Sequence, residues 1–563
     1  MASRYRPIRP KCGACGPVVQ QGLLCVLLQL SQAHAQVVPD AGALRQQIER
    51  ERAPDVPPRP PQLSVPRAEE GKESASQEQF AVSRFRFAGN TLLAAEQLLV
   101  AVQPYVNRSL RLEELRAAAA AVAASYRQAG WVARVYVPQQ DITQGEVTLQ
   151  IVEAVFSGTR ISGPEPLRLK SSDVLSIAAA NLKVGAPLNT AAVDRVLLLA
   201  DDLPGVSVSG ALSEGAQEGQ TGLVLRFTDE PLFNGEAYGD NQGSHSTGSE
   251  RVVLSASLSS PLGLGDRLTS DLLHTQGSDY VRMAYSLPVY ADGLRLGASV
   301  SQFNYRLVTE EFASLQSSGA AESMGLEASY PLLRTPARNL SLSLAYDRRR
   351  YHTEAAQTVQ SHYQVDDYSI TLAGNLSDKL AGGGYNTASL TLLSGRLDYA
   401  SPDPAENRTL EGDFQKWRYA LARQQTLTSA LTLVATLSGQ QADRLLDSSE
   451  GFYLGGPTGV RAYPASEGSG SQGQLASLEL RYRFTKDWLF STFLDSGSVS
   501  GAGVNTHLEG YGLGLSWQGP LGAVLKVVYA HRIGSNPNPT ASGRDQDGSL
   551  DLDRWWLSLS LPF

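Results

Sequence analysis

The chain has 563 residues, a formal net charge of −8 and 42% hydrophobic residues. The length predicts more than one domain, and the excess of acidic residues disfavours nucleic acid as a partner. The mean hydropathy of −0.19 suits a soluble protein, and beyond residue 35 the sequence has no run of roughly 18 apolar residues, which excludes a membrane-spanning helix there.

An export signal is predicted at the start of the chain, over residues 1–35. A basic beginning is followed by an apolar stretch at residues 22–30, and Ala33-His-Ala35 has the pattern of a signal-peptidase site. The apolar stretch is too short to span a bilayer. All three cysteines lie within this signal, so we expect no redox or metal-binding thiol in the exported chain. The exported chain is then either soluble or enters a membrane as a closed barrel of strands.

Residues 36–52 are predicted to contain one polar helix, capped at its start by Asp40. Its only large apolar residues, Leu44 and Ile48, are four positions apart and therefore share one face. Such a helix could lie in a polar channel or be surrounded by solvent, and its composition does not favour one environment over the other. Residues 53–79 are predicted to form a flexible, extended linker, because they are rich in proline, which disfavours both helix and sheet.

Two compact α/β units are predicted after the linker. The first covers residues 80–155 and has the order β-α-α-β-β, with strands at 80–87, 131–137 and 147–152 and helices at 93–102 and 112–128. The second covers residues 156–229 and repeats that order, with strands at 156–161, 206–212 and 222–227 and helices at 171–181 and 190–200. A repeat of this kind predicts tandem domains of one fold.

The remainder of the chain, residues 230–563, is predicted to form a 16-stranded antiparallel transmembrane β-barrel. Apolar and polar residues alternate over segments of roughly ten residues, and an even strand number suits a single-chain barrel. A water-soluble sheet with one buried face could alternate in the same way. The connections alternate between short turns and long polar loops, such as 305–320, 395–411, 441–472 and 533–550, and this favours the barrel. The predicted strands lie near residues 233–241, 249–259, 265–275, 279–288, 292–304, 321–332, 338–349, 364–375, 383–394, 412–423, 429–440, 473–484, 488–496, 506–517, 521–532 and 551–563.

The last predicted strand presents one large apolar face. This face is formed by Trp555, Leu557, Leu559, Leu561 and Phe563. A final strand that ends on an aromatic residue resembles the C-terminal assembly signal of bacterial outer-membrane proteins. The resemblance implies that the chain meets outer-membrane lipid and the barrel-assembly machinery.

The two α/β units resemble POTRA domains, the polypeptide-transport-associated modules of outer-membrane translocases. Four short motifs in the first unit carry the resemblance, namely Phe87-Ala-Gly-Asn90, Tyr126-Arg-Gln-Ala-Gly130, Val137-Pro-Gln-Gln140 and Gln144-Gly145. Two such domains before a 16-stranded barrel resemble the transporter of a two-partner secretion system, of the haemolysin activation and secretion type. The polar helix at the start similarly resembles the helix that plugs the barrel of such transporters.

Two motifs within the predicted barrel strengthen this resemblance. Val460-Arg461-Ala462-Tyr463 resembles the Val-Arg-Gly-Tyr/Phe tip of the superfamily's long loop, with alanine in place of glycine, so we expect that this tip does not need a positive φ. Phe493-Leu-Asp495 resembles the superfamily's Phe-x-Asp strand motif. The resemblance implies that the loop folds into the lumen and that Arg461 meets Asp495, a pairing that suits a planar guanidinium and a carboxylate.

The resemblance implies an outer-membrane translocator whose POTRA domains face the periplasm. These domains would recognise an unfolded secreted partner of the adhesin, cytolysin or toxin type, and strand addition to a sheet edge is a natural mode because main-chain hydrogen bonds need no particular sequence. The partner would then pass through the lumen. The sequence contains no nucleotide-binding, zinc-binding or hydrolase motif, so we expect no catalytic residue, no metal, no cofactor and no nucleotide hydrolysis.

Three alternative functions remain open from the sequence. An assembly or insertion factor of the same superfamily would have a similar barrel, although such factors typically carry more POTRA domains. A passive porin would have no use for the α/β units or the plug-like helix. A secreted all-β enzyme or lectin would not explain the alternating loop lengths.

Overall fold

The computed structural model describes residues 38–51, 63–64, 79–142, 144–289, 291–400, 408–465, 467–501, 503–537, 539–540 and 542–563. The predicted export signal and most of the predicted linker lie outside the described residues. Across the described ranges, no helix is both long enough and apolar enough to cross a membrane.

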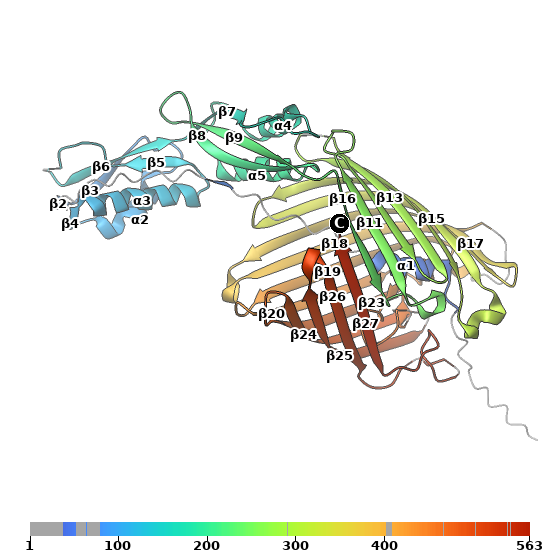
Figure 1. The fold of residues 1–563 in the computed structure, drawn as a ribbon. Coiled ribbons are helices and arrows are strands. Elements are labelled where there is room, and N and C mark those ends of the chain that lie inside the picture. The colour runs from blue at the N-terminus through green and yellow to red at the C-terminus, as the bar shows by residue number, and fades with distance from the viewer. Residues whose placement is uncertain are drawn as a thin grey trace, which may run out of the picture.

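The first α/β unit packs two helices on one face of a small sheet (Figure 1). Its elements are β2 (Gln79–Val82), β3 (Arg84–Ala88), α2 (Ala95–Val102), β4 (Arg108–Arg111), α3 (Leu112–Gln128), β5 (Ala133–Tyr136) and β6 (Glu146–Glu153). The sheet order is β3-β6-β5, with β3 parallel to β6. Leu98 and Leu115 from the helices meet Leu149 and Ile151 from β6 in an apolar core, so burial of this helix face stabilises the unit.

Two details of the first unit differ from the expected element order. The single strand expected at residues 80–87 is divided at Ser83, where the backbone N–H groups of Ser83 and Arg84 both donate to the carbonyl of Gly145. Before this division β2 pairs with β4, a strand that the sequence analysis did not identify. The residues of β4 are mostly polar and exposed, so they lack the apolar alternation by which strands are recognised.

The second α/β unit has the same plan and an additional edge strand. Its elements are β7 (Val155–Ile161), α4 (Ser171–Asn181), α5 (Thr190–Asp201), β8 (Val206–Glu214) and β9 (Gln220–Asp229). β1 (Leu63–Ser64), from the predicted linker, pairs in parallel with β8 and extends the sheet to the order β1-β8-β9-β7. The expectation that the linker stays out of sheets is therefore wrong at these two residues, which lie between prolines and keep their own N–H groups.

Among the described strands, β10 to β20 and β23 to β27 form a closed antiparallel barrel in which β27 pairs with β10. All sixteen predicted strands are present. They are β10 (Phe233–Asp240), β11 (Arg251–Ser259), β12 (Arg267–His274), β13 (Ser278–Pro288), β14 (Arg295–Arg306), β15 (Ser318–Arg334), β16 (Arg338–Ala355), β17 (Thr358–Asp378), β18 (Gly384–Tyr399), β19 (Gly412–Thr426), β20 (Leu431–Ala442), β23 (Gln472–Arg483), β24 (Trp488–Gly501), β25 (Val504–Gln518), β26 (Val524–Arg532) and β27 (Asp553–Pro562).

The outer wall of the barrel is apolar. Large hydrophobic side chains that are exposed to the surroundings recur along its strands, among them Leu326, Leu392, Leu478 and Leu513. Between them on the same strands, residues such as Glu479 turn inward. This alternation gives an apolar exterior and a polar lumen, the pattern typical of a transmembrane barrel.

The expected alternation of loop lengths is incomplete. At the barrel end next to the α/β units, which we call the proximal end, the connections are short. At the far end five connections are long, but 275–277, 356–357 and 502–503 are not. β16 and β17 continue beyond the rim and are joined through Ala356 and Gln357, both with positive φ (48° and 62°). Two successive positive φ angles make a tight hairpin turn that usually contains Asn or Gly, so these residues gave no turn signal.

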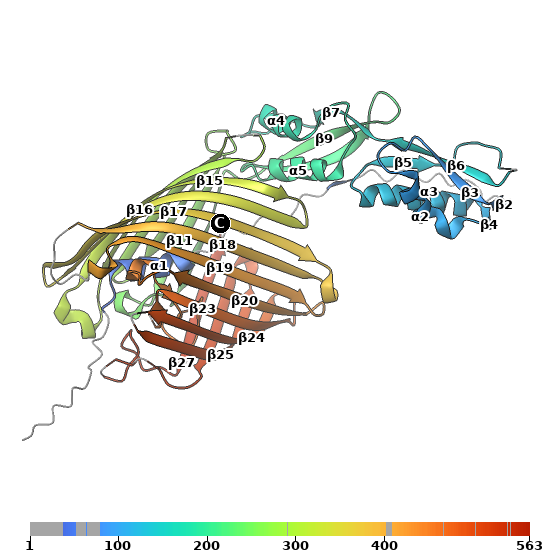
Figure 2. The same cartoon turned by 180° about the vertical axis from the view of Figure 1, so that it is seen from behind.

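The second α/β unit is fixed to the proximal end of the barrel (Figure 2). The Arg334 guanidinium on β15 donates to both carboxylate oxygens of Asp202, at 2.9 and 2.6 Å. Arg195 on α5 donates to the carbonyl of Pro331 near the proximal end of β15 (3.2 Å) and to that of Asp292 in a proximal turn (3.0 Å). These contacts place α5 at the rim of the barrel opening.

Candidate translocation pore

The connection between β20 and β23 folds back into the barrel. This lumen loop, residues 443–471, contains the short strands β21 (Phe452–Tyr453) and β22 (Ser469–Gly470), which pair with each other. The motif residues Val460, Ala462 and Tyr463 are at most 1% exposed. The loop therefore fills part of the lumen instead of extending from the rim.

Arg461 at the tip of the lumen loop is bonded to the barrel wall. Its Nε and Nη2 donate to the two carboxylate oxygens of Asp495 on β24, both at 2.8 Å. Its Nη1 donates to Glu479 on β23 at 2.8 Å. The guanidinium also lies over the ring of Phe493, 3.3 Å from its centroid. A planar fork with two carboxylates and an aromatic face is a strong and directional anchor.

Alanine at position 462 fits the tip without backbone strain. Among the described loop residues, positive φ angles occur at Gly456 and Gly468, and Ala462 is not one of the residues that adopt one. A Cβ added to Gly510 on β25 would lie only 2.6 Å from the Cβ of Ala462. The missing side chain of Gly510 thus leaves space for the methyl group of Ala462.

Trp556 on β27 is a contact residue that the sequence analysis missed. Its indole Nε1 donates to the carbonyl of Arg461 at 2.8 Å. The sequence contained a usable signal, because adjacent strand residues point to opposite faces. Trp555 faces outward and is 61% exposed, whereas Trp556 is 7% exposed and faces the lumen.

The apolar residues of the last strand face outward, as the alternation indicated. Leu557, Leu559 and Leu561 are between 43% and 50% exposed. The terminal Phe563 packs against Phe233 with ring centroids 5.5 Å apart, and its N–H donates to the carbonyl of Gly235 at 2.9 Å. This end of the chain therefore contributes to the closure between β27 and β10.

The N-terminal helix α1 (Ala41–Glu51) lies inside the barrel (Figure 1, Figure 2). Asp40 caps it by accepting the N–H of Ala43 at 2.8 Å. Leu44 is buried in an apolar cluster of the lumen, and Ile48 packs at the edge of that cluster. Of the two environments that the composition allowed, the helix therefore occupies the channel.

Polar side chains of α1 bond to the lumen loop on one side of the helix and to the wall on the other. Gln46 donates to the carbonyl of Gly451 at 2.5 Å, and Arg50 donates to the carbonyl of Gly455 at 2.8 Å. Arg45 donates to Ser323 on β15 at 3.2 Å, and Tyr280 on β13 donates to Glu49 at 2.7 Å. The helix and the loop together occupy the far part of the lumen.

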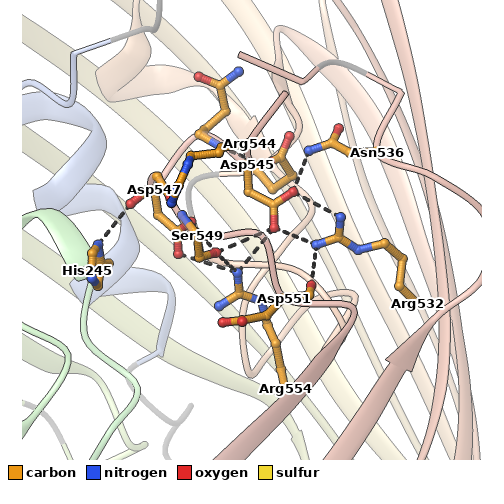
Figure 3. A network of polar contacts seen from close by, with 12 residues as sticks. His245, Arg532, Asn536, Arg544, Asp545, Asp547, Ser549, Asp551 and Arg554 are labelled. Carbon is orange, nitrogen blue, oxygen red and sulfur yellow. Dashed lines mark hydrogen bonds and ion pairs between the residues drawn. The ribbon is translucent and has the colours of Figure 1, made fainter. Parts of the chain in front are cut away.

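A second far-end loop, residues 533–552, contacts the lumen loop and contains a network of polar contacts (Figure 3). Asp545 lies between two arginines, accepting from Arg532 at 2.9 and 2.5 Å and from Arg554 at 3.3 Å. The backbone N–H of Gln546 donates to Glu467 of the lumen loop at 3.0 Å. Burial, and next the negative charge of Asp545, raise the pKa of Glu467 to about 7.

Comparison with known proteins identifies the family. The family model described as haemolysin secretion/activation protein ShlB/FhaC/HecB matches residues 219–517, and a model of the ShlB-type POTRA domain matches residues 80–154. The chain belongs to the ShlB/FhaC/HecB family. It is an outer-membrane transporter of the two-partner secretion type, with its POTRA domains in the periplasm.

Two curated relatives and two solved structures are similar over most of the chain. The heme/hemopexin transporter protein HuxB of Haemophilus influenzae is 26% identical over 499 residues, which are 84% of this chain and 85% of the relative. The outer membrane transporter CdiB of Dickeya dadantii is 23% identical over 458 residues, 79% of this chain and 80% of the relative. CdiB from Escherichia coli has the same fold, with a TM-score of 0.67, 20% identity and coverage of 88% of this chain and 92% of that chain. BamA from Haemophilus ducreyi without POTRA domains 1–3 shares the fold less closely, with a TM-score of 0.52, 14% identity and coverage of 86% and 100%.

The transporter contains a cavity between α1 and its second α/β unit. The cavity has a volume of about 1640 Å³ and is lined by inward side chains of the barrel wall, by Ile48 of α1 and by Asp201 and Asp202 at the end of α5. Its wall carries both arginines and carboxylates, including Arg282 and Asp271. A mixed polar lining of this kind is suited to an extended polypeptide, because it offers hydrogen bonds without a preference for one sequence.

Proposed function

We propose that α1 and the lumen loop form the closed gate of this transporter. In this proposal, the Val460-Arg461-Ala462-Tyr463 tip and the Phe493-x-Asp495 strand motif hold the loop, and Leu44 and Ile48 seat the helix. The observation that carries the proposal is that helix and loop occupy the far lumen through side-chain hydrogen bonds, with a polar cavity on their periplasmic side. A chain that enters from the periplasm reaches this cavity first.

The POTRA domains would recognise an unfolded exoprotein of the adhesin, cytolysin or toxin type. Strand addition is supported by the β8 edge of the second unit, which already pairs with the extended residues Leu63–Ser64. A cargo strand would either replace these two residues or use another sheet edge. Neither capture nor passage requires a catalytic residue, a cofactor or nucleotide hydrolysis in this scheme.

The proposed organisation of the chain follows the same scheme. It comprises a signal peptide at 1–35, the plug helix at 36–52, a linker at 53–79, POTRA domains at 80–155 and 156–229 and the barrel at 230–563. The outward apolar wall would contact outer-membrane lipid. The face made by Trp555, Leu557, Leu559, Leu561 and Phe563 would serve as the signal read by the barrel-assembly machinery.

A deletion strain tests the transport proposal and identifies the cargo. We expect that one large exported protein disappears from the culture supernatant and cell surface and accumulates or is degraded in the periplasm. A joint decline of many outer-membrane proteins would instead assign the chain to barrel assembly and contradict the proposal.

Conductance in planar bilayers tests the plug. Deletion of residues 39–52 removes the helix that fills the far lumen, so we expect a higher ion conductance than that of the full-length chain. The matched control replaces the same residues by a glycine–serine segment of equal length, which has the same reach but no helix. Unchanged conductance in both variants would contradict the plug.

A further inference from the structure

Glu450 at the start of the lumen loop lies in a buried cluster of charges. Its side chain is 1% exposed. One carboxylate oxygen lies 2.8 Å from Nη1 of Arg349 on β16, and the other lies 2.5 Å from Nζ of Lys416 on β19. Arg349 is additionally paired with Asp367 on β17. The carboxylate therefore joins the loop to a wall that is distinct from the β23–β24 wall bonded to Arg461.

The backbone at the same residue is also held. The carbonyl of Glu450 accepts from Nζ of Lys416 at 3.0 Å and from the Gln440 amide at 2.9 Å. The same Gln440 amide donates to the carbonyl of Ser471 at 3.1 Å. Gln440 thus connects the beginning and the end of the loop, next to the point at which the ion pairs hold it.

The seat of α1 is built from the immediate neighbours of Glu450. The hydroxyl of Ser448 donates to the carboxylate of Asp40 at 2.7 and 2.9 Å. The carbonyls of Gly451 and Gly455, described above, accept from Gln46 and Arg50. These contacts all fall on the first half of the loop, residues 448–455, whereas the tip held by Arg461 lies further along the chain.

We infer that Glu450 is a positioning residue that holds the seat of the plug helix, independently of the anchor formed by Arg461. The inference rests on the proposed role of α1 as a plug. The lumen loop then has two anchors on two walls. The Glu450 anchor on β16 and β19 positions residues 448–455 and with them α1, and the Arg461 anchor on β23 and β24 positions the tip.

The chemistry of the cluster explains why the carboxylate matters. The side chain of Lys416 is fully buried and faces Glu450. Nη2 of Arg418 also lies 4.0 Å from the same carboxylate. If the carboxylate becomes an amide, Lys416 loses its counter-charge, whereas Arg349 keeps Asp367. A buried cation without a partner is strongly unfavourable, so Lys416 either gives up its proton or draws in water, and both outcomes end the ion pair that holds the loop segment.

Two engineered cysteine pairs report the two halves of the loop separately. The first pair, Asp40→Cys with Ser448→Cys, joins α1 to its seat at a place where the native side-chain oxygens are 2.7 Å apart. The second pair, Ala462→Cys with Gly510→Cys, joins the tip to β25, where the two Cβ positions are 2.6 Å apart, so a small shift brings them to disulfide spacing. All native cysteines lie at or before residue 25, so the exported chain offers no competing thiol.

Glu450→Gln is introduced into each cysteine background, and cells are oxidised with copper phenanthroline. We expect Glu450→Gln to lower the yield of the first disulfide several-fold and to leave the yield of the second unchanged. Introduced into the protein without engineered cysteines, Glu450→Gln should raise the ion conductance. The matched control is Asp495→Asn, the same carboxylate-to-amide change at the other anchor, for which we expect the second disulfide to decrease more than the first. Equal effects of Glu450→Gln on both disulfides, or no effect on the first, would overturn the inference.

Two further measurements separate positioning from general destabilisation. The double variant Lys416→Met/Glu450→Gln removes the fully buried cation that lost its partner, while Arg349 keeps Asp367 and the side chain of Arg418 is 45% exposed. We therefore expect partial recovery of the first disulfide relative to Glu450→Gln alone. No recovery would contradict a role through Lys416. If deletion of residues 39–52 leaves conductance unchanged, the plug proposal fails, but the disulfide yields still decide whether Glu450 positions the seat.

Discussion

The second POTRA domain and the interior of the barrel are stabilised by different kinds of contact. In the domain, Val193 and Leu197 of α5 pack against Val208 of β8 and Leu223 of β9 with almost no exposed surface. In the lumen, α1 and the loop are attached through ion pairs and hydrogen bonds, such as those of Arg461, in addition to two apolar clusters that include Leu44 and Val460. The apolar packing suits a part that stays folded, and the polar attachment suits parts that separate.

The physical reason is the response of each contact to water. An apolar core that opens loses the free energy of burial with nothing in exchange. A hydrogen bond in a water-accessible lumen is exchanged for hydrogen bonds to water, so its net contribution is only about 0.5–1.5 kcal/mol. A gate attached by many such bonds is ordered at rest and can still be released by a polypeptide that brings hydrogen-bonding groups of its own.

The largest effect on the polar attachment inside the lumen is expected from Arg461→Ala. The substitution leaves the buried carboxylate of Asp495 without its guanidinium, and removing one partner of a buried ion pair costs about 3–5 kcal/mol. We expect the tip to leave the wall and secretion of the partner to fall sharply, while the barrel still reaches the membrane. Secretion is measured by immunoblot of the supernatant, and heat-modifiable migration reports barrel folding.

The control for Arg461→Ala is Arg350→Ala. Arg350 is exposed on β16 and donates to Gln364 at 3.1 Å, so its removal eliminates an arginine without exposing a buried carboxylate. We expect normal secretion from this control. Normal secretion from Arg461→Ala as well would show that the tip anchor is dispensable.

The apolar side of the comparison is tested by Leu197→Ala. Leu197 is 1% exposed in the core of the second POTRA domain, and a buried leucine-to-alanine change costs about 2–5 kcal/mol. We expect the domain to become protease-sensitive at a lower temperature in the purified full-length protein, with the barrel unaffected. Leu99→Ala, at a leucine of α2 that is 44% exposed, serves as the control and should leave the protease profile unchanged.

A smaller effect than those of the two preceding substitutions is expected from pH, which acts on the contact between the lumen loop and the loop at residues 533–552. The pKa of Glu467 is raised from 4.5 to about 7, first by burial and then by Asp545 and Asp547. A carboxyl whose pKa is raised in the closed arrangement favours closure below its ordinary pKa, and this preference is lost as the pH rises through the raised value. We therefore expect the conductance in planar bilayers to increase between about pH 5 and about pH 8.

Glu467→Gln separates this effect from other titrations. The amide does not ionise, so the increase in conductance near neutral pH should be absent in this variant. Burial and the nearby Asp447 also raise the pKa of Asp40, to about 6, which leaves a second and more acidic step that Glu467→Gln does not remove. A Glu467→Gln profile identical to that of the parent would exclude Glu467 as the source of the neutral step.

The sequence predicted those features that depend on local periodicity. The sixteen barrel strands and the paired helices of both POTRA domains follow from alternation and helical spacing, which each segment displays by itself. β4 was not predicted because three of its four residues are polar and exposed, so its one buried residue, Leu110, shows no apolar alternation. The hairpin at Ala356–Gln357 was not predicted because neither residue normally favours a positive φ.

The site could be predicted only as far as its motifs reach. The Arg461–Asp495 pairing was expected from the resemblance of two short motifs, and the two side chains are in contact. The contact of Glu450 with Lys416 and Arg349 carried no such signal, since none of these three residues lies in a motif that the sequence analysis identified. Charge pairs of this kind depend on how the loop lies in the lumen, which alternation along a strand does not encode.

The smallest effect is expected for an ion pair on the outer surface, which sharpens the comparison with Arg461. The side chains of Arg396 and Asp398 on β18 are 60% and 44% exposed and lie 2.9 Å apart. An exposed pair of this type contributes about 0–1 kcal/mol, because water and salt screen its attraction. We expect Arg396→Ala to leave both secretion and heat-modifiable migration unchanged within error. A clear loss of secretion would mean that surface charge near the far rim, and not only the polar attachment inside the lumen, contributes to export.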